Sequence, residues 1–367
     1  MIAIVILLIL AGISISALTN TGIFQKATDA KSVSENAENE QSQTLGEYER
    51  ELNKYSALEL TEDKMNKVLS MTENTFLKDA NGNNFTLPAG FKVVVNEDTN
   101  NAKTVDKGIV IEDATVDNNG NVTPTNGSQF VWVPVGDITK EDGTIEKINL
   151  DRYMFANDGN GTPISQGENV INSYYSEEIV SKGNTIAKNL SNFKNSVVSN
   201  EGFYIGRYEA RTVKERTAND KDLMQITEKS SDPIYNYVNQ KQSAILSQNM
   251  YNSSKFTSDL INSYAWDTAT LFLQTCGDND IPYSWQTTKN TVLLKMGTEN
   301  DKQCNIFDMA SNVREWTTET SLINEQPCVD RGGIYNDKSN YMSIRVSGTS
   351  SYSYDYIGFR PIIYINN

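Results

Sequence analysis

The C-terminal segment Asn305–Ile365 constrains the fold more than any other part of the chain. It combines large apolar side chains, among them Trp316, with the glycine pair Gly332–Gly333. Large apolar residues beside turn-forming glycines predict short buried strands joined by tight turns. The intervening segment Ile334–Tyr356 is polar and rich in tyrosine, with little core character. The pattern therefore predicts a rigid scaffold that displays a polar surface.

Motifs in this segment resemble those of the formylglycine-generating-enzyme family, also called sulfatase-modifying-factor domains, a branch of the C-type lectin fold. The matching residues are Asp308, Met309, Asn312, Val313, Glu315 and Trp316, then Arg331, Gly332 and Gly333, and finally Ile357–Arg360. Upstream stretches that agree with the same family are Phe130–Pro134, Gly202–Glu209 and Ser263–Ala269. The resemblance spans residues 86–367 and implies an α+β domain of the C-type lectin type.

Hydrophobic patterns place the expected elements of this domain. Strands are expected at Phe85–Val95, Phe130–Val135 and Phe203–Tyr208, because aromatic and β-branched residues cluster there. A helix is expected at Thr257–Cys276, where apolar residues recur at helical spacing. Residues 57–85 are more polar and are expected to form a neck that precedes the domain.

The N-terminal segment Met1–Leu18 is almost wholly apolar, and Lys26 is the first charged residue. At about 1.5 Å per residue, a helix of this length would cross or nearly cross a bilayer. The stretch Ile4–Ile15 resembles the pilin-like leaders of Gram-positive anaerobes. With the proline-free polar stretch that follows, it predicts a long stalk helix over residues 1–56, hydrophobic first and polar later. A plain signal anchor and a signal peptide are the alternatives.

The acidic balance of the chain argues against nucleic acid as a partner. The formal net charge is −15 and the isoelectric point is about 4.6, so the phosphate backbone would be repelled. The chain has no histidine. This excludes Ser-His-Asp and Cys-His catalysis and histidine-based zinc or iron sites.

The chain has three cysteines, Cys276, Cys304 and Cys328, with no Cys-x-x-Cys motif. At most one intramolecular disulfide can form, Cys276–Cys304 or Cys304–Cys328, and buried thiols are the alternative. Active members of the resembled family carry a cysteine pair after the Arg-Gly-Gly motif. Asp337 and Met342 occupy those positions here, so the resemblance implies no copper-dependent thiol oxidation. We therefore expect no catalytic residue, no copper and no iron.

The resemblance implies a Ca²⁺ site in the loop before Trp316. Its ligands would be the side chains of Asp308 and Glu315 and the backbone carbonyls of Ser311 and Val313. A hard cation prefers several oxygen ligands, which an irregular loop can supply. The alternative is that the two carboxylates cap turns or pair with a nearby arginine.

The segment Ile334–Tyr356 is the predicted ligand-binding surface. Tyrosine offers rigid amphipathic area, and serine, asparagine and glycine adapt by hydrogen bonding. The segment also resembles the variable region of proteins diversified by bacterial retroelements. The predicted contact residues are Tyr335, Asn336, Asp337, Asn340, Tyr341, Tyr352, Tyr354 and Asp355. The alternatives are a polar loop that covers the core, or a contact between subunits.

Together these features predict a non-catalytic, cell-surface filament subunit of the type IV pilin kind that displays a lectin-fold domain for adhesion. Its partners would be copies of itself through the N-terminal helix, the membrane before assembly, and an unknown extracellular glycan or protein. A monomeric membrane-anchored adhesin is the alternative function, and an oxidoreductase of the formylglycine-generating type is a third hypothesis.

Overall fold

The computed structural model describes residues 48, 52, 55–155, 163–166, 174–177, 179–180, 183–219, 223–227, 231–277, 302–337 and 341–366. The chain divides into two compact units, Met1–Leu52 and Asn53–Asn367. Nearly all described residues belong to the second unit, which is built mainly of strands.

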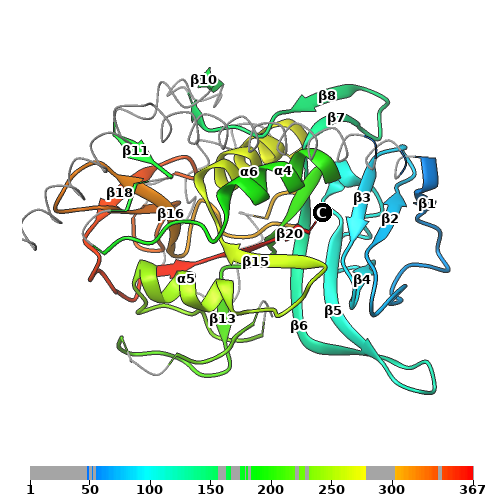
Figure 1. The fold of residues 1–367 in the computed structure, drawn as a ribbon, viewed down its shortest axis with the longest axis horizontal. Helices are drawn as coiled ribbons and strands as arrows, with labels where there is room; N and C mark the ends of the chain where they lie inside the picture. The colour runs from blue at the N-terminus through cyan, green and yellow to red at the C-terminus, as the bar shows by residue number, and fades with distance from the viewer. Residues whose placement is uncertain are drawn as a thin grey trace, which may run out of the picture. The chain divides into compact units, whose positions relative to one another are not determined.

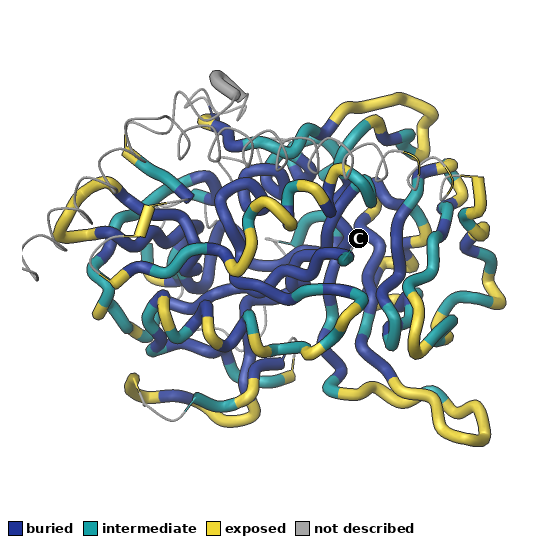
Figure 2. The backbone as a smooth tube through the Cα atoms, in the orientation of Figure 1, coloured by how far each residue is buried: buried dark blue, intermediate teal, exposed yellow. Residues whose placement is uncertain are grey.

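The centre of this unit is an antiparallel sheet of six strands in the order β15-β20-β12-β6-β5-β4 (Figure 1). Its strands are β4 (Phe91–Val94), β5 (Val110–Val116), β6 (Val122–Pro134), β12 (Gly202–Gly206), β15 (Phe256–Leu260) and β20 (Pro361–Ile365). Every residue of β12 and β20 is buried, and the tube is mostly dark through the middle of the molecule in Figure 2. Strands covered on both faces carry continuous rather than alternating apolar residues.

A second sheet contains the motif residues and has the order β11-β16-β17-β18, with β19 parallel to β16. Its strands are β11 (Tyr175–Ser176), β16 (Arg314–Ser321), β17 (Cys328–Arg331), β18 (Arg345–Gly348) and β19 (Ile357–Phe359). Only the first residue of β16 is not fully buried. The pairing of β16 with β17 shifts register between Trp316 and Thr320, as at a β-bulge.

Smaller pairings complete the described strands. They are β1 (Leu58–Glu59), β2 (Thr75–Lys78) and β3 (Asn84–Leu87) in one sheet, and the pairs β7 (Gly136–Thr139) with β8 (Ile145–Ile148), β9 (Tyr153–Phe155) with β10 (Pro163–Gln166), and β13 (Arg211–Thr212) with β14 (Ile226–Thr227). A 3-10 turn, η1, spans Val105–Lys107.

The named α-helices of the described chain are α4 (Leu190–Asn200), α5 (Gln240–Gln248) and α6 (Ser263–Cys276). Each is preceded by an asparagine as its N-cap, and the asparagine side chain accepts from a backbone N–H inside the first turn. Such caps satisfy donors that the helix itself leaves unpaired.

Helix α4 and strand β3 cover opposite faces of the central sheet. Phe193 of α4 meets the rings of Phe203 and Tyr364, with centroids 5.5 Å apart in each pair. The next residue along β12, Tyr204, points to the other face and donates its hydroxyl to the carbonyl of Thr86 at 2.9 Å. The sheet is thus the middle layer of the core.

Strands β5 and β6 continue beyond the sheet as a long hairpin, which is exposed towards its tip (Figures 1 and 2). Its turn is organised by Asp117, whose Oδ1 accepts from the N–H groups of Asn119 and Asn121 at 2.8 and 2.9 Å. Aspartate is favoured at such turns because its side chain can bond the backbone two residues on.

The prediction of an α+β fold behind a long pilin-like helix is wrong for the described chain. Strands predominate there, and α4, α5 and α6 have 11, 9 and 14 residues. No helix among the described residues is long and apolar enough to cross a membrane. The transmembrane and pilin-like predictions therefore have no support in them. Residues 1–47, from which those predictions came, lie outside the described residues.

Two expected boundaries also differ. Residues 57–85 contain β1, β2 and the start of β3, and their side chains Leu77 and Phe85 belong to the main core, so the expected neck is part of the domain. The expected helix Thr257–Cys276 begins only at Ser263, because Phe256–Leu260 pairs with β20 as strand β15. Asn262 separates the two elements as the helix cap.

Candidate ligand-binding surface

A buried group of charges ties the second sheet to helix α6. Arg331 of β17 donates to Asp267 of α6 at 2.6 Å and to Glu319 of β16 at 3.4 Å, and Arg345 of β18 donates to both carboxylates. Arg152 also pairs with Glu319. Asp267, Glu319 and Arg331 are 0% exposed. The network joins strands of the second sheet to a helix that packs on the first.

The surrounding arginines keep Glu319 ionised although it is buried. Burial alone would raise the pKa of Glu319, but the guanidinium groups of Arg345, Arg331 and Arg152 lower it to about 2. The pKa of Arg345 is raised despite burial, because Asp267 and Glu319 flank it. Buried charges are tolerated only when they are paired and hydrogen-bonded in this way.

Three tyrosines at alternate positions, Tyr352, Tyr354 and Tyr356, pack ring against ring and are called the tyrosine ladder. The rings of Tyr352 and Tyr354 meet edge to face with centroids 5.1 Å apart, and those of Tyr354 and Tyr356 stack at 5.2 Å with an interplanar angle of 5°. Tyr354 is 42% exposed. The backbone behind it is fixed, because its carbonyl accepts from the N–H of Tyr237 at 3.0 Å.

Tyr335 and Asp355 lie together next to the ladder. The Tyr335 hydroxyl donates to Oδ2 of Asp355 at 2.9 Å, and its N–H donates to the carbonyl of Asn312 at 2.8 Å. Burial and the neighbouring Asp355 carboxylate raise the pKa of Tyr335. With 8% of its surface exposed, Tyr335 positions Asp355 rather than offering a contact face of its own.

The other predicted contact residues are spread more widely. Asn336 is exposed and Asp337 half-buried. Tyr341 is half-buried and packs against Tyr153 and Phe155 in a separate small cluster. Asn340 lies outside the described residues. The structure thus brings together Tyr335, Tyr352, Tyr354 and Asp355 of the predicted set.

Sequence reasoning did not select Tyr356, the third ring of the ladder, or the supporting segment at Asn236 and Tyr237. The signal for Tyr356 was present, because residues two apart on an extended chain share a face. The support was not visible, since Asn236 reaches the carbonyl of Asp355 from far away in sequence, at 3.0 Å.

The residues of the predicted calcium loop are buried, and Glu315 has a cationic partner already. Both Glu315 oxygens accept from Arg360, with Nη2–Oε1 at 2.6 Å and Nε–Oε2 at 2.9 Å. Burial raises the pKa of Glu315 while Arg360 opposes that rise. The partner of Glu315 is therefore Arg360. The Arg360 guanidinium also donates to the carbonyls of Gly206 and Phe307, each at 2.8 Å.

Glu209 holds the rest of this loop. Its oxygens accept from the side-chain amide of Asn312 at 2.6 Å and from the N–H of Val313 at 2.9 Å. Burial, Asp308 and Glu315 raise its pKa well above the usual range. Among the described residues, no three metal-ligating side chains converge on one point. Glu315 does not fit a calcium ligand set while Arg360 occupies both its oxygens, and calcium binding stays a prediction.

Asp337 and Met342 stand where active members of the resembled family carry their two thiols, and Asp337 is half-buried. Met342 is buried in the main core, and its carbonyl accepts from the Trp266 indole at 3.0 Å. Burial raises the pKa of Cys276 and of Cys328 to about 12, so both thiols are protonated at neutral pH.

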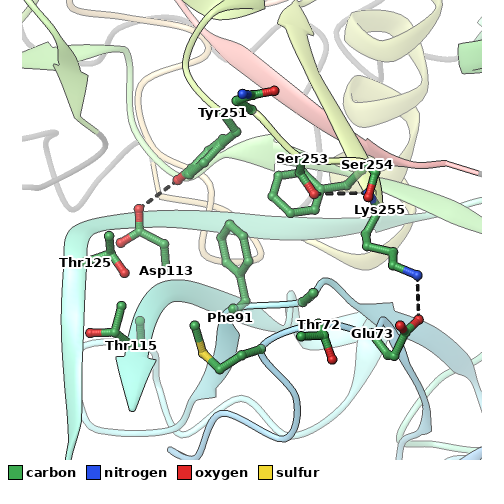
Figure 3. A pocket seen from close by; sticks show the side chains of 16 residues that line it. Thr72, Glu73, Phe91, Asp113, Thr115, Thr125, Tyr251, Ser253, Ser254 and Lys255 are labelled. Carbon is green, nitrogen blue, oxygen red and sulfur yellow. Dashed lines mark hydrogen bonds and ion pairs between the residues drawn. The ribbon is translucent and has the colours of Figure 1, made fainter. Parts of the chain in front are cut away.

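A cavity of about 670 Å³ lies at the base of the long hairpin, and none of the predicted site residues lines it (Figure 3). The rings of Phe91 and Tyr251 form part of its wall, with centroids 5.7 Å apart. The Tyr251 hydroxyl donates to Asp113 at 2.8 Å, and Lys255 pairs with Glu73 at 2.6 Å. Both acids have partners, so the cavity offers hydroxyl groups and apolar wall rather than an unpaired charge.

No protein-family model and no curated protein matches the chain. The structure is similar to variable protein 1 of Treponema denticola, with a TM-score of 0.36 and 12% identity over 65% of this chain and 97% of that one. It is also similar to PvdO from Pseudomonas aeruginosa, with a TM-score of 0.36 and 10% identity over 65% of this chain and 95% of that one. A likeness to CarF has a TM-score of 0.32 and 16% identity, over 45% and 87% of the two chains. At these TM-scores the likeness is weak and carries no functional conclusion.

Proposed function

We propose that this chain is a non-catalytic recognition protein that binds a macromolecular ligand through the tyrosine ladder. The observation that carries the proposal is the stacked arrangement of Tyr352, Tyr354 and Tyr356, with Tyr354 42% exposed. Rings that are already stacked lose little conformational freedom when a ligand binds them, so their contact area contributes to affinity. The proposal includes no filament, because the stalk prediction is contradicted.

The chemistry of the second sheet also supports recognition rather than catalysis. The sequence has no histidine, and the buried acids Glu319 and Asp267 are held by arginines. A general base must instead have a proton affinity matched to the working pH and reach its substrate. The ladder offers hydroxyl groups and aromatic faces, which suit hydrogen bonding and stacking.

The test is the change Tyr354→Ala, with Tyr174→Ala as the matched control, because Tyr174 is a 66% exposed tyrosine outside the ladder. The labelled full chain and both variants are applied to an array of defined glycans and to an array of purified secreted proteins. We expect specific binding to at least one probe, loss of at least tenfold in affinity for Tyr354→Ala, and no change for Tyr174→Ala. The tenfold loss corresponds to about 1.4 kcal/mol, which is typical of a contact that matters.

Equal binding by the two variants would show that the ligand contacts a surface other than the tyrosine ladder. Binding by neither variant, with circular dichroism unchanged, would show a nonspecific effect of surface tyrosines and would count against the ladder. Binding to glycans or to proteins decides the class of ligand.

A further inference from the structure

The sequence allows two intramolecular disulfides, Cys276–Cys304 and Cys304–Cys328, and the structure favours the first. Cys328 is buried in the apolar cluster that contains Trp316 and Phe359. Cys276 and Cys304 instead both pack against the main core cluster. No disulfide is present among the three thiols. A Cys304–Cys328 bond would therefore join two different parts of the core, whereas Cys276 and Cys304 share one.

The backbones that carry Cys276 and Cys304 approach one another closely. A Cβ atom on Gly277 would lie 3.5 Å from Cβ of Gln303 and 2.9 Å from its Oε1. Native disulfides join Cβ atoms roughly 3.5–4.5 Å apart, so these neighbouring residues are already at that spacing. Gly277 follows α6 directly, and Cys276 and Cys304 each lie one residue away from this close approach of Gly277 to Gln303.

Both cysteines also line one cavity, of about 590 Å³. The Cys304 thiol donates to the carbonyl of Asp106 at 3.7 Å, and the Asp106 carboxylate acts on the Cys276 thiol as well. Each cysteine is half-buried rather than sealed in the core. A small reagent can therefore enter the cavity that the two thiols share.

We propose that Cys276 and Cys304 form a dithiol site that a small-molecule disulfide, such as oxidised glutathione, converts into an intramolecular disulfide. This site is independent of the tyrosine ladder. It would link the end of α6 to the loop at residues 302–305.

Cys304 is the thiol that reacts first. Lys107 also lines the cavity, and although burial acts to lower the pKa of its ammonium group, Glu141, Asp106 and the Cys304 thiolate raise it. Lys107 is thus close enough to act electrostatically on Cys304, and the thiolate is the nucleophilic form of a cysteine. Burial raises the pKa of Cys276 to about 12, so Cys276 suits the second, intramolecular step.

The exchange proceeds in two balanced steps. The Cys304 thiolate attacks one sulfur of oxidised glutathione, breaks its S–S bond, forms a mixed disulfide and releases one glutathione thiolate. Cys276 then loses its proton to solvent and attacks the Cys304 sulfur, which forms the protein disulfide and releases the second glutathione. Two electrons pass from the protein thiols to the two glutathione molecules.

The test treats the folded full chain with oxidised glutathione, blocks remaining thiols with N-ethylmaleimide after unfolding, and maps peptides by mass spectrometry without reduction. We expect a crosslinked peptide that contains Cys276 and Cys304, an alkylated Cys328, and a melting temperature that rises by about 5 °C and falls again with dithiothreitol. Cys328→Ser should keep the crosslink, and Cys304→Ser should lose it.

The order of attack has its own control. Lys107→Met should slow formation of the crosslink, whereas Lys103→Met, which removes another lysine that lines the same cavity, should leave the rate unchanged. The proposal is overturned if Cys276 and Cys304 are both alkylated in the oxidised sample. It is equally overturned if Cys304 is found paired with Cys328 or with a second chain.

Discussion

At Gly348 in β18, a Cβ atom would lie 2.8 Å from Cδ2 of Tyr352 and 3.1 Å from Cη2 of Trp316. The first ring of the ladder thus packs directly on the backbone over the buried Trp316. The Trp316 indole is itself fixed, because it donates to the carbonyl of Val238 at 2.8 Å. The absence of one side chain at residue 348 lets the ladder rest on a rigid support.

We expect Gly348→Ala to lower the free energy of unfolding by about 1–3 kcal/mol, because the added methyl group overpacks a filled site. It should also displace Tyr352 and weaken binding to whichever probe the wild type recognises. Urea denaturation and the binding array measure the two effects. Ser347→Ala, in the same strand, should change neither, and an unchanged Gly348→Ala would show that the ladder does not depend on this support.

The composition of Ile334–Tyr356 indicates a tyrosine-rich surface but does not say which rings face outwards. Tyr335 and Tyr354 are tyrosines of the same polar segment, yet Tyr335 is 8% exposed and Tyr354 is 42% exposed. The difference follows from Asn312 and Asp355, which fix Tyr335 from two distant parts of the chain. Such contacts between distant residues have no local signal in the sequence.

At the scale of the elements, the buried charges hold α6, β16, β17 and β18 together. Arg331 contributes two ion pairs, to Asp267 and Glu319, and a hydrogen bond to the carbonyl of Ile344 at 2.8 Å. Removal of one partner from a buried pair leaves an uncompensated charge in a medium that solvates it poorly.

We expect Arg331→Met to lower the free energy of unfolding by about 3–5 kcal/mol. Lys255→Met is the matched control, since its pair with Glu73 is 38% and 67% exposed and should contribute at most about 1 kcal/mol. Chemical denaturation of the two variants gives both values. Equal, small losses would mean that the arginines of the second sheet do not hold it to α6.

The same elements show where sequence patterns suffice. The apolar spacing in Thr257–Cys276 correctly indicated a helix, and the strong aromatic stretches at Phe130–Val135 and Phe203–Tyr208 became central strands. The pattern failed at Phe256–Leu260, where pairing with β20 decides the conformation. The pattern also did not show the partner of Glu315, because Arg360 lies 45 residues further along the chain.

At the scale of the whole molecule, buried acids give stability an unusual pH dependence. Burial raises the pKa of Glu177 and of Asp330 to about 7 and that of Asp259 to about 6. The folded state then binds protons that the unfolded chain has released, so stability falls as pH rises through these values. Glu319, with its pKa lowered to about 2, acts in the opposite sense only in strong acid.

We expect the free energy of unfolding to be larger at pH 5 than at pH 8, with each unit of pKa shift contributing about 1.4 kcal/mol. Denaturation curves at pH 5, 6.5 and 8 measure the trend. Glu177→Gln keeps a neutral hydrogen-bonding side chain beside Thr318 and should reduce the slope. Stability that increases steadily from pH 5 to pH 8 would contradict the assignment.

The class of the fold was the least predictable property. The resemblance in Asn305–Ile365 indicated short strands, yet the apolar Met1–Leu18 led to a long helical stalk that the described chain does not support. An apolar segment shows that side chains avoid water, but it does not show what covers them. Residues 57–85 illustrate the same difficulty. The segment is polar as a whole, and this hid the fact that Leu77 and Phe85 belong to the core.

The position of β20 has a consequence for synthesis. This strand pairs on one side with β12 and on the other with β15, both of which are made earlier on the ribosome. Until residues 361–365 emerge, those two strands each present an open edge, and such edges invite pairing with other nascent chains. Protection of these two edges until β20 pairs with both strands would therefore limit aggregation during folding.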